Sequence, residues 1–291
     1  MIGLEDGSLQ LLKQLLQLAI EKKKLREVIE LIGPDGYGLM ISALKTNPAA
    51  ASLILRTTKE HGCADGVHNV VLVREAGRKD EERKLLNKSL AMLITEMKRF
   101  ELLSELQLSQ KDWMHCDANG DNLWHYAART QDLRAIELFR IFELKGIPIK
   151  PNNQQSTPLH EAVQSCDCSA NSVLEPIEYL AANSPQGARD TFGRTPLHYA
   201  FASRKQLTKG ELTQATRDPI AVVTILTRNM TKQQLDWADC DGNTALHLAA
   251  FKNANICAVT LLRKGVSVSV NNKVITSVTL NSLQNVLIVE R

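Results

Sequence analysis

The chain has little of several features that would indicate a particular biochemical function. Of its 291 residues only 4% are aromatic, and the formal net charge is +3. No run of about 18 apolar residues occurs, so no transmembrane span is predicted. The mild charge does not favour nucleic acid as a partner, because such partners select for a strongly basic face. We therefore expect a soluble intracellular protein that neither inserts into a membrane nor binds nucleic acid.

Signatures of catalysis and of metal binding are also missing. The six cysteines offer one close pair, Cys166 and Cys168, whose one-residue spacer is not that of the usual zinc-binding pairs. No glycine-rich segment carries the Lys-Ser/Thr ending of a phosphate-binding loop, and no Ser or Cys stands in a recognisable nucleophile motif. We expect a non-catalytic protein without cofactor or metal, in which Cys166 and Cys168 are at most exposed, oxidisable side chains.

What the chain does contain is one short phrase in four copies. Each copy has the form Thr-Pro-Leu-His-x-Ala or a variant of it, at residues 122–128, 157–162, 195–200 and 244–250. The threonine can cap a following helix, and proline just inside the start of a helix costs no hydrogen bond. Leu and Ala three residues apart then share one face of that helix. Four copies in order predict a tandem-repeat architecture.

Preceded by Asp-x-x-Gly-x and followed by a second apolar helix, this phrase resembles the ankyrin repeat. The copy at 239–250 departs from the family pattern only by Ala245 in place of proline, and the copy at 190–198 is equally close. The resemblance implies an all-α fold, an ankyrin-repeat helical solenoid with β-turn or hairpin loops. It also implies that the histidines of the phrase hydrogen-bond the turns of adjacent repeats.

The repeats are irregular in length. The intervals between His125, His160, His198 and His247 are 35, 38 and 49 residues, against about 33 for this class of repeat. We place the excess in insertions at 166–172 and 206–217. Such insertions often lie on a binding face, but drift in a tolerant surface loop explains them equally well.

Four segments are predicted along the chain. Residues 1–32 form an N-terminal capping helix, with the helix itself over 8–32, and residues 33–115 hold degenerate repeats and a long helical segment around 80–108. Ankyrin repeats occupy 116–270, and 271–291 form an irregular tail. Either the tail forms a C-terminal cap without the repeat pattern, or the chain is a fragment of a longer protein.

The resemblance implies a module that binds another protein, as an adaptor, scaffold or inhibitor in the cytoplasm or nucleus. One alternative is a regulatory or targeting segment of a larger enzyme, channel or ubiquitin ligase, and another is an effector that a bacterium secretes into host cytoplasm. Phe192 stands out because an exposed aromatic side chain is costly unless it anchors a partner, although it could instead fold back on the neighbouring hairpin. The predicted contact residues lie at loop tips and on inner helices: Asn119, Asp121, Tyr126, Arg129, Gln154, Gln155, Glu161, Gln164, Phe192, Arg194, Tyr199, Asp241, Asn243 and Lys252.

Overall fold

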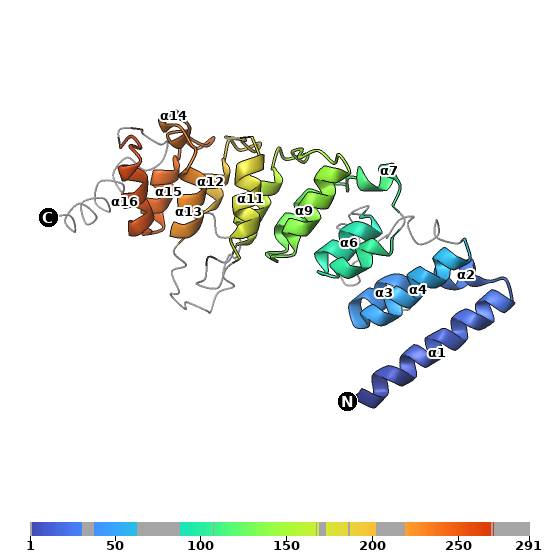
Figure 1. Cartoon of the computed structure of the whole chain (residues 1–291). Helices are drawn as coiled ribbons and strands as arrows, with labels where there is room; N and C mark the ends of the chain where they lie inside the picture. The colour runs from blue at the N-terminus through green and yellow to red at the C-terminus, as the bar shows by residue number, and fades with distance from the viewer. Residues whose placement is uncertain are drawn as a thin grey trace. The chain divides into compact units, whose positions relative to one another are not determined.

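A computed structural model describes residues 2–30, 38–62, 88–106, 108–166, 168, 173–185, 187–201, 219–268 and 270 (Figure 1). The chain divides into two compact units. The first comprises Met1–Tyr126 with Ile141–Ile147, and the second comprises Ala127–Arg140 with Pro148–Arg291. Each unit is described by itself below.

The first unit begins with helices α1, Ile2–Glu21, and α2, Leu25–Glu30. The single helix predicted over 8–32 is therefore wrong in its bounds. The break falls at Lys23, whose φ is +54°, and the amide of Lys24 closes the end of α1 on the carbonyl of Ala19 at 2.8 Å. A left-handed residue cannot continue a right-handed helix, so the chain turns and α2 packs back on α1.

Helices α3, Leu39–Thr46, and α4, Pro48–Glu60, form a contacting pair in the segment expected to be a degenerate repeat. The side chain of Asn47 caps α4 by accepting the amide of Ala49 at 2.9 Å, and Pro48 occupies the first turn. Gly62 follows α4 with φ +67°. Asn47 thus separates the two helices and Gly62 follows the second; the beginning of this segment, 33–37, lies outside the described residues.

The segment expected to be helical around 80–108 contains two short helices, α6, Leu90–Glu96, and the 3-10 helix η2, Phe100–Ser104. Lys98, with φ +58°, ends α6 in the manner of Lys23. All residues of α6 from Leu90 to Thr95 are buried, so this helix lies at the centre of its unit rather than on a face. Residues 80–87 lie outside the described part of the chain.

Helices α8, Leu123–Arg129, and α9, Ala135–Leu144, have residues in both units. Within the first unit, Trp124 is fully buried and its indole N–H donates to the carbonyl of Ile147 at 2.9 Å. The Phe142 ring meets the Trp124 ring edge-on at 5.4 Å. This aromatic contact fixes the start of the first recognisable repeat.

In the second unit three helix pairs stack side by side (Figure 1). One row contains α10, Pro158–Ser165, α12, Pro196–Tyr199, and α15, Ala245–Phe251. The other row contains α11, Glu175–Asn183, α13, Ile220–Thr227, and α16, Asn255–Arg263. Each helix contacts its partner in the pair and the next helix of its own row. The Leu-His phrase begins every helix of the first row, which is the arrangement that the four copies predict.

Two one-turn helices were not predicted, α7, Gln110–Trp113, and α14, Lys232–Leu235. Each starts with a capping box, Ser109 with Asp112 in α7 and Thr231 with Gln234 in α14. Each shortly precedes a repeat hairpin, so both replace part of the usual connection between repeats.

The all-α prediction is confirmed, since the described residues contain helices and turns and no strand. Most of the predicted insertion at 166–172, all of 206–217 and all of the 271–291 tail lie outside the described residues. No helix in the described part of the chain is long and apolar enough to cross a membrane.

Candidate functional site: the hairpin tips

Four hairpins share one turn geometry. Each starts with an acidic residue or asparagine, namely Asp117, Asn152, Asp190 and Asp239. In every copy its Oδ1 accepts the backbone amides two and four residues later, at 2.8 to 3.0 Å. Its own amide donates to the carbonyl four residues later at 2.9 Å. Because one side chain holds two amides, the tip is rigid before any partner arrives.

The fourth position of each hairpin requires a left-handed backbone. Glycine takes it in three copies, with φ of +78° at Gly120, +73° at Gly193 and +81° at Gly242. In the remaining copy Gln155 adopts φ +59°, which costs a non-glycine residue about 1 kcal/mol. Gln155 therefore stores strain that the other three tips avoid.

The phrase histidines tie consecutive repeats together. The Nδ1 atom of His160 accepts the backbone amide of Thr157 at 3.1 Å and lies 2.9 Å from its hydroxyl, while Nε2 lies 3.1 Å from the carbonyl of Arg194 in the next hairpin. His198 repeats this with Thr195 and the carbonyl of Asn243. With Nδ1 accepting, Nε2 must carry the proton and donate, so each ring is neutral. The scaffold role that the resemblance implies matches these bonds.

Burial holds these rings in the neutral form. It lowers the pKa of His160 to about 4, against the upward pull of the Arg194 carbonyl and of Asp190. Burial also lowers the pKa of His198 and, at the more exposed end of the row, that of His247. The His160 ring is therefore not placed to exchange protons near neutral pH.

The hairpin tips of the second unit are also linked through their backbones. The amide of Thr191 donates to the carbonyl of Gln154, and the amide of Cys240 donates to the carbonyl of Phe192, each at 2.9 Å. Three successive tips thus form one continuous ladder. A partner would meet their side chains at fixed mutual positions.

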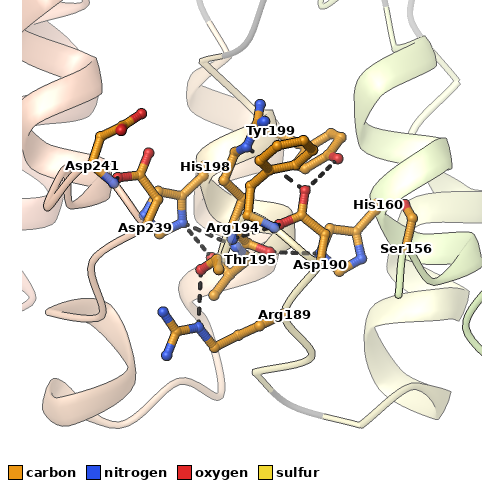
Figure 2. A network of polar contacts seen from close by, with 12 residues as sticks. Ser156, His160, Arg189, Asp190, Arg194, Thr195, His198, Tyr199, Asp239 and Asp241 are labelled. Atoms are coloured by element: carbon orange, nitrogen blue, oxygen red, sulfur yellow. Dashed lines mark hydrogen bonds and ion pairs between the residues drawn. The ribbon is translucent and has the colours of Figure 1, made fainter. Parts of the chain in front are cut away.

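One cluster on this ladder combines aromatic and charged groups (Figure 2). The guanidinium carbon of Arg194 lies 4.6 Å from the ring centre of Phe192 and 5.9 Å from that of Tyr199. Asp190 accepts the Tyr199 hydroxyl at 2.8 Å, and its Oδ2 lies 3.7 Å from Nε of Arg194. Burial first and the bond to Asp190 second raise the pKa of Tyr199 to about 12, so its hydroxyl stays a donor.

The exposed fraction of Phe192 is 53%, and the Arg194 guanidinium of the same hairpin lies over its ring. Arg194 is half-buried, and its backbone is held on both sides, the amide by Asp190 and the carbonyl by His160. A guanidinium stacked on aromatic rings keeps its in-plane N–H groups directed to the side. The pair is thus an ordered aromatic and cationic surface at a loop tip.

The predicted contact residues separate into two groups. Side chains that are exposed or half-exposed number eleven: Asn119, Arg129, Gln154, Gln155, Gln164, Phe192, Arg194, Tyr199, Asp241, Asn243 and Lys252. Asp121, Tyr126 and Glu161 are buried, with exposed fractions of 2%, 3% and 6%. Tyr126 donates its hydroxyl to Asp117 at 2.8 Å, and Glu161 accepts Arg129 at 2.8 Å. These three side chains support the hairpins from inside, so the expectation that they face a partner does not fit their positions.

Asp190 is the important residue that the sequence reasoning left out. It organises the turn, holds Tyr199 and neutralises Arg194, although it is itself buried. The signal that could have identified it is its place at the start of the hairpin, which Asp117 and Asp239 share.

No group of three or more His, Cys, Asp or Glu side chains in the described residues could hold a metal ion. A cavity of about 20 Å³ lies beneath Thr195 and is lined mainly by apolar groups, with Ser184 beside them. That volume suits one water molecule rather than a cofactor.

Comparison with known proteins agrees with this geometry. Residues 241–273 match the family model described as ankyrin repeat. A poly [ADP-ribose] polymerase tankyrase of Caenorhabditis elegans is 36% identical over 270 residues, which cover 92% of this chain and 12% of that protein. The ankyrin repeat domain of Bcl-3, described as a unique member of the IkappaB protein family, superimposes with a TM-score of 0.53 at 18% identity, over 86% of this chain and 99% of that domain.

Proposed function

We propose that this chain, whose residues 241–273 match the ankyrin-repeat model, is a non-catalytic module that binds another protein through its hairpin tips and the adjoining helices of the first row. Stacked repeats present many variable positions on one fixed framework, which suits recognition of a macromolecule. The proposal covers the exposed and half-exposed residues named above. The three buried ones act as their supports.

The observation that carries this proposal is the exposed Phe192 with Arg194 stacked on it. Aromatic residues and arginine are the side chains that most often dominate binding energy at protein interfaces. Here both are ordered in the free protein, so binding would lose little side-chain entropy. Arg194 supplies in-plane donors for a polar group of the partner while Phe192 supplies an apolar face.

A capture experiment tests the proposal. The whole chain is immobilised, proteins retained from an extract of the source organism are identified, and the affinity of each purified candidate is measured. Phe192→Ala with Arg194→Ala should weaken binding about 30-fold, because losing two anchors costs about 2 kcal/mol or more. Leu133→Ala is the matched control, since Leu133 is 54% exposed but lies in the turn between α8 and α9. Equal affinities for the double variant and the wild type would rule out this tip as the anchor.

A second candidate function follows from the tankyrase relative. The chain spans 12% of the length of that protein, so it resembles a part of a much longer polypeptide. In this alternative the chain is the targeting segment of a larger enzyme and delivers a bound protein to a catalytic domain elsewhere. Sequencing the full transcript and assaying the whole product for ADP-ribose transfer to the captured partner would test it. A complete reading frame ending at Arg291 would contradict it.

A further inference from the structure

Cys166 and Cys168 come into contact at the end of helix α10. Their Sγ atoms lie 3.9 Å apart, and the amide of Cys168 points to the sulfur of Cys166 at 3.4 Å. Both residues are half-exposed. Among the described cysteines this is a preformed pair of thiols that small reagents can reach.

The backbone around the pair explains the contact. Cys166 closes α10, with its amide donating to the carbonyl of Ala162 at 3.1 Å, and then turns out of the helix with φ −62° and ψ 128°. Cys168 adopts φ +51°, a left-handed value that costs a non-glycine residue about 1 kcal/mol. The Sγ atom of Cys168 therefore lies against that of Cys166. Residues held in such strained conformations are concentrated at functional and switching positions.

We propose that Cys166 and Cys168 form a reversible disulfide, so that this turn is a dithiol modification site. The oxidant is a low-molecular-weight disulfide such as glutathione disulfide. One cysteine thiolate attacks that disulfide, breaking its S–S bond and releasing one glutathione thiolate. The second cysteine thiolate then attacks the protein sulfur of the mixed disulfide and releases the second glutathione. The protein loses two protons and two electrons, and glutathione disulfide gains them.

The pair differs from the other described cysteines in a way that supplies controls. Cys116 and Cys240 are exposed, whereas Cys257 is buried. Exposed single thiols stop at the mixed disulfide. A neighbouring thiol in contact resolves the mixed disulfide at once, because its local concentration is high.

Mass spectrometry of the whole chain after treatment with glutathione disulfide tests the proposal. Trypsin cuts after Lys145 and Arg189 and leaves Lys150 intact before proline, so one peptide holds both cysteines and no other. This peptide should lose two hydrogen atoms and carry no glutathione, while the peptides with Cys116 and Cys240 carry one glutathione each. In Cys168→Ser the same peptide should carry one glutathione on Cys166. Dithiothreitol should reverse every product.

A rate comparison separates the contribution of the fold from that of the sequence. A synthetic peptide of residues 163–172 has the same spacing without the end of α10. The folded chain should close its disulfide about tenfold faster than this peptide, because its thiols already touch. Equal rates, or a stable mixed disulfide at Cys166 in the wild type, would overturn the proposal.

Discussion

The hairpins at 152–156 and 190–194 are built alike and present different surfaces. In both, the first side chain holds two amides, and a phrase histidine follows four residues after the hairpin ends. The 152–156 tip carries Gln154 and the strained Gln155, whereas the 190–194 tip carries the exposed Phe192 and a glycine. The scaffold and the surface of a repeat thus vary independently.

The residue after the histidine shows the same separation. Tyr199 holds the Asp190 of its own hairpin, while Glu161, at the equivalent position, holds Arg129 and receives the Ser156 hydroxyl at 3.4 Å. A phenol and a carboxylate thus occupy equivalent positions in two repeats, and each bonds to side chains of the protein itself. The residue type at this position therefore does not predict whether the side chain contacts a partner unless its burial is known.

Breaking the histidine link between the two hairpins should lower the free energy of unfolding more than any other change considered below. His160→Ala removes the bonds at Nδ1 and Nε2 and leaves a cavity, so it should lower the free energy of unfolding by about 3 to 4 kcal/mol. His247→Ala should cost less, because His247 is only half-buried. Urea denaturation followed by circular dichroism measures both, and equal losses would contradict the assigned difference in burial.

Acid should weaken the same link. The pKa of His160 is lowered to about 4 in the folded chain, while the unfolded side chain titrates near 6.5. Between those values the unfolded state binds more protons, so this contribution to stability is complete above pH 6.5 and is lost as pH falls towards 4. His160 alone should account for about 3 kcal/mol. The pH dependence of the urea midpoint should be shallower in His160→Gln; an unchanged profile would count against the assignment.

Removing one hydroxyl tests the difference at the slot after the histidine. Tyr199→Phe leaves the buried carboxylate of Asp190 without its 2.8 Å donor, and should cost about 1 to 2 kcal/mol of stability. Tyr126→Phe is the parallel variant, because its hydroxyl meets Asp117 at the same distance in the first unit. Both variants should have a lower Tm than the wild type, and an unchanged Tm in Tyr199→Phe would mean that Arg194 compensates Oδ2 of Asp190 without the hydroxyl.

Exchanging the residues at the left-handed position should give the smallest effects, with opposite signs. Gln155→Gly relieves the strain at φ +59° and should stabilise the chain by at most about 0.5 kcal/mol, after allowing for the greater freedom of unfolded glycine. Gly193→Ala should destabilise it by at least about 1 kcal/mol, since an added Cβ would also lie 2.8 Å from the Arg189 guanidinium. Changes of the same sign in both variants would show that φ does not govern this position.

Much of the second unit could be predicted from sequence because the repeat phrase carries local signals that agree with one another. Threonine, proline and histidine at fixed spacing each specify part of the start of a helix, and all copies of the phrase lie where expected. The helix breaks at Lys23 and Lys98 were missed because lysine carries no left-handed preference of its own, so its identity gives no signal for the turn that ends each helix. The burial of Asp121 and Glu161 was missed because polarity predicts exposure, and only their internal partners reverse that expectation.

The ladder of tips has a consequence for engineering. The hydrogen bonds that the tip amides and the phrase histidines make between repeats end on main-chain atoms of the receiving hairpin: the carbonyls of Gln154 and Phe192 accept amides, and those of Arg194 and Asn243 accept histidines. Every amino acid supplies that carbonyl. A library that randomises positions 154, 192 and 241 would therefore leave the connecting bonds chemically unchanged. The chain would then serve as a display framework whose repeats stack in the same way whichever side chains its tips carry.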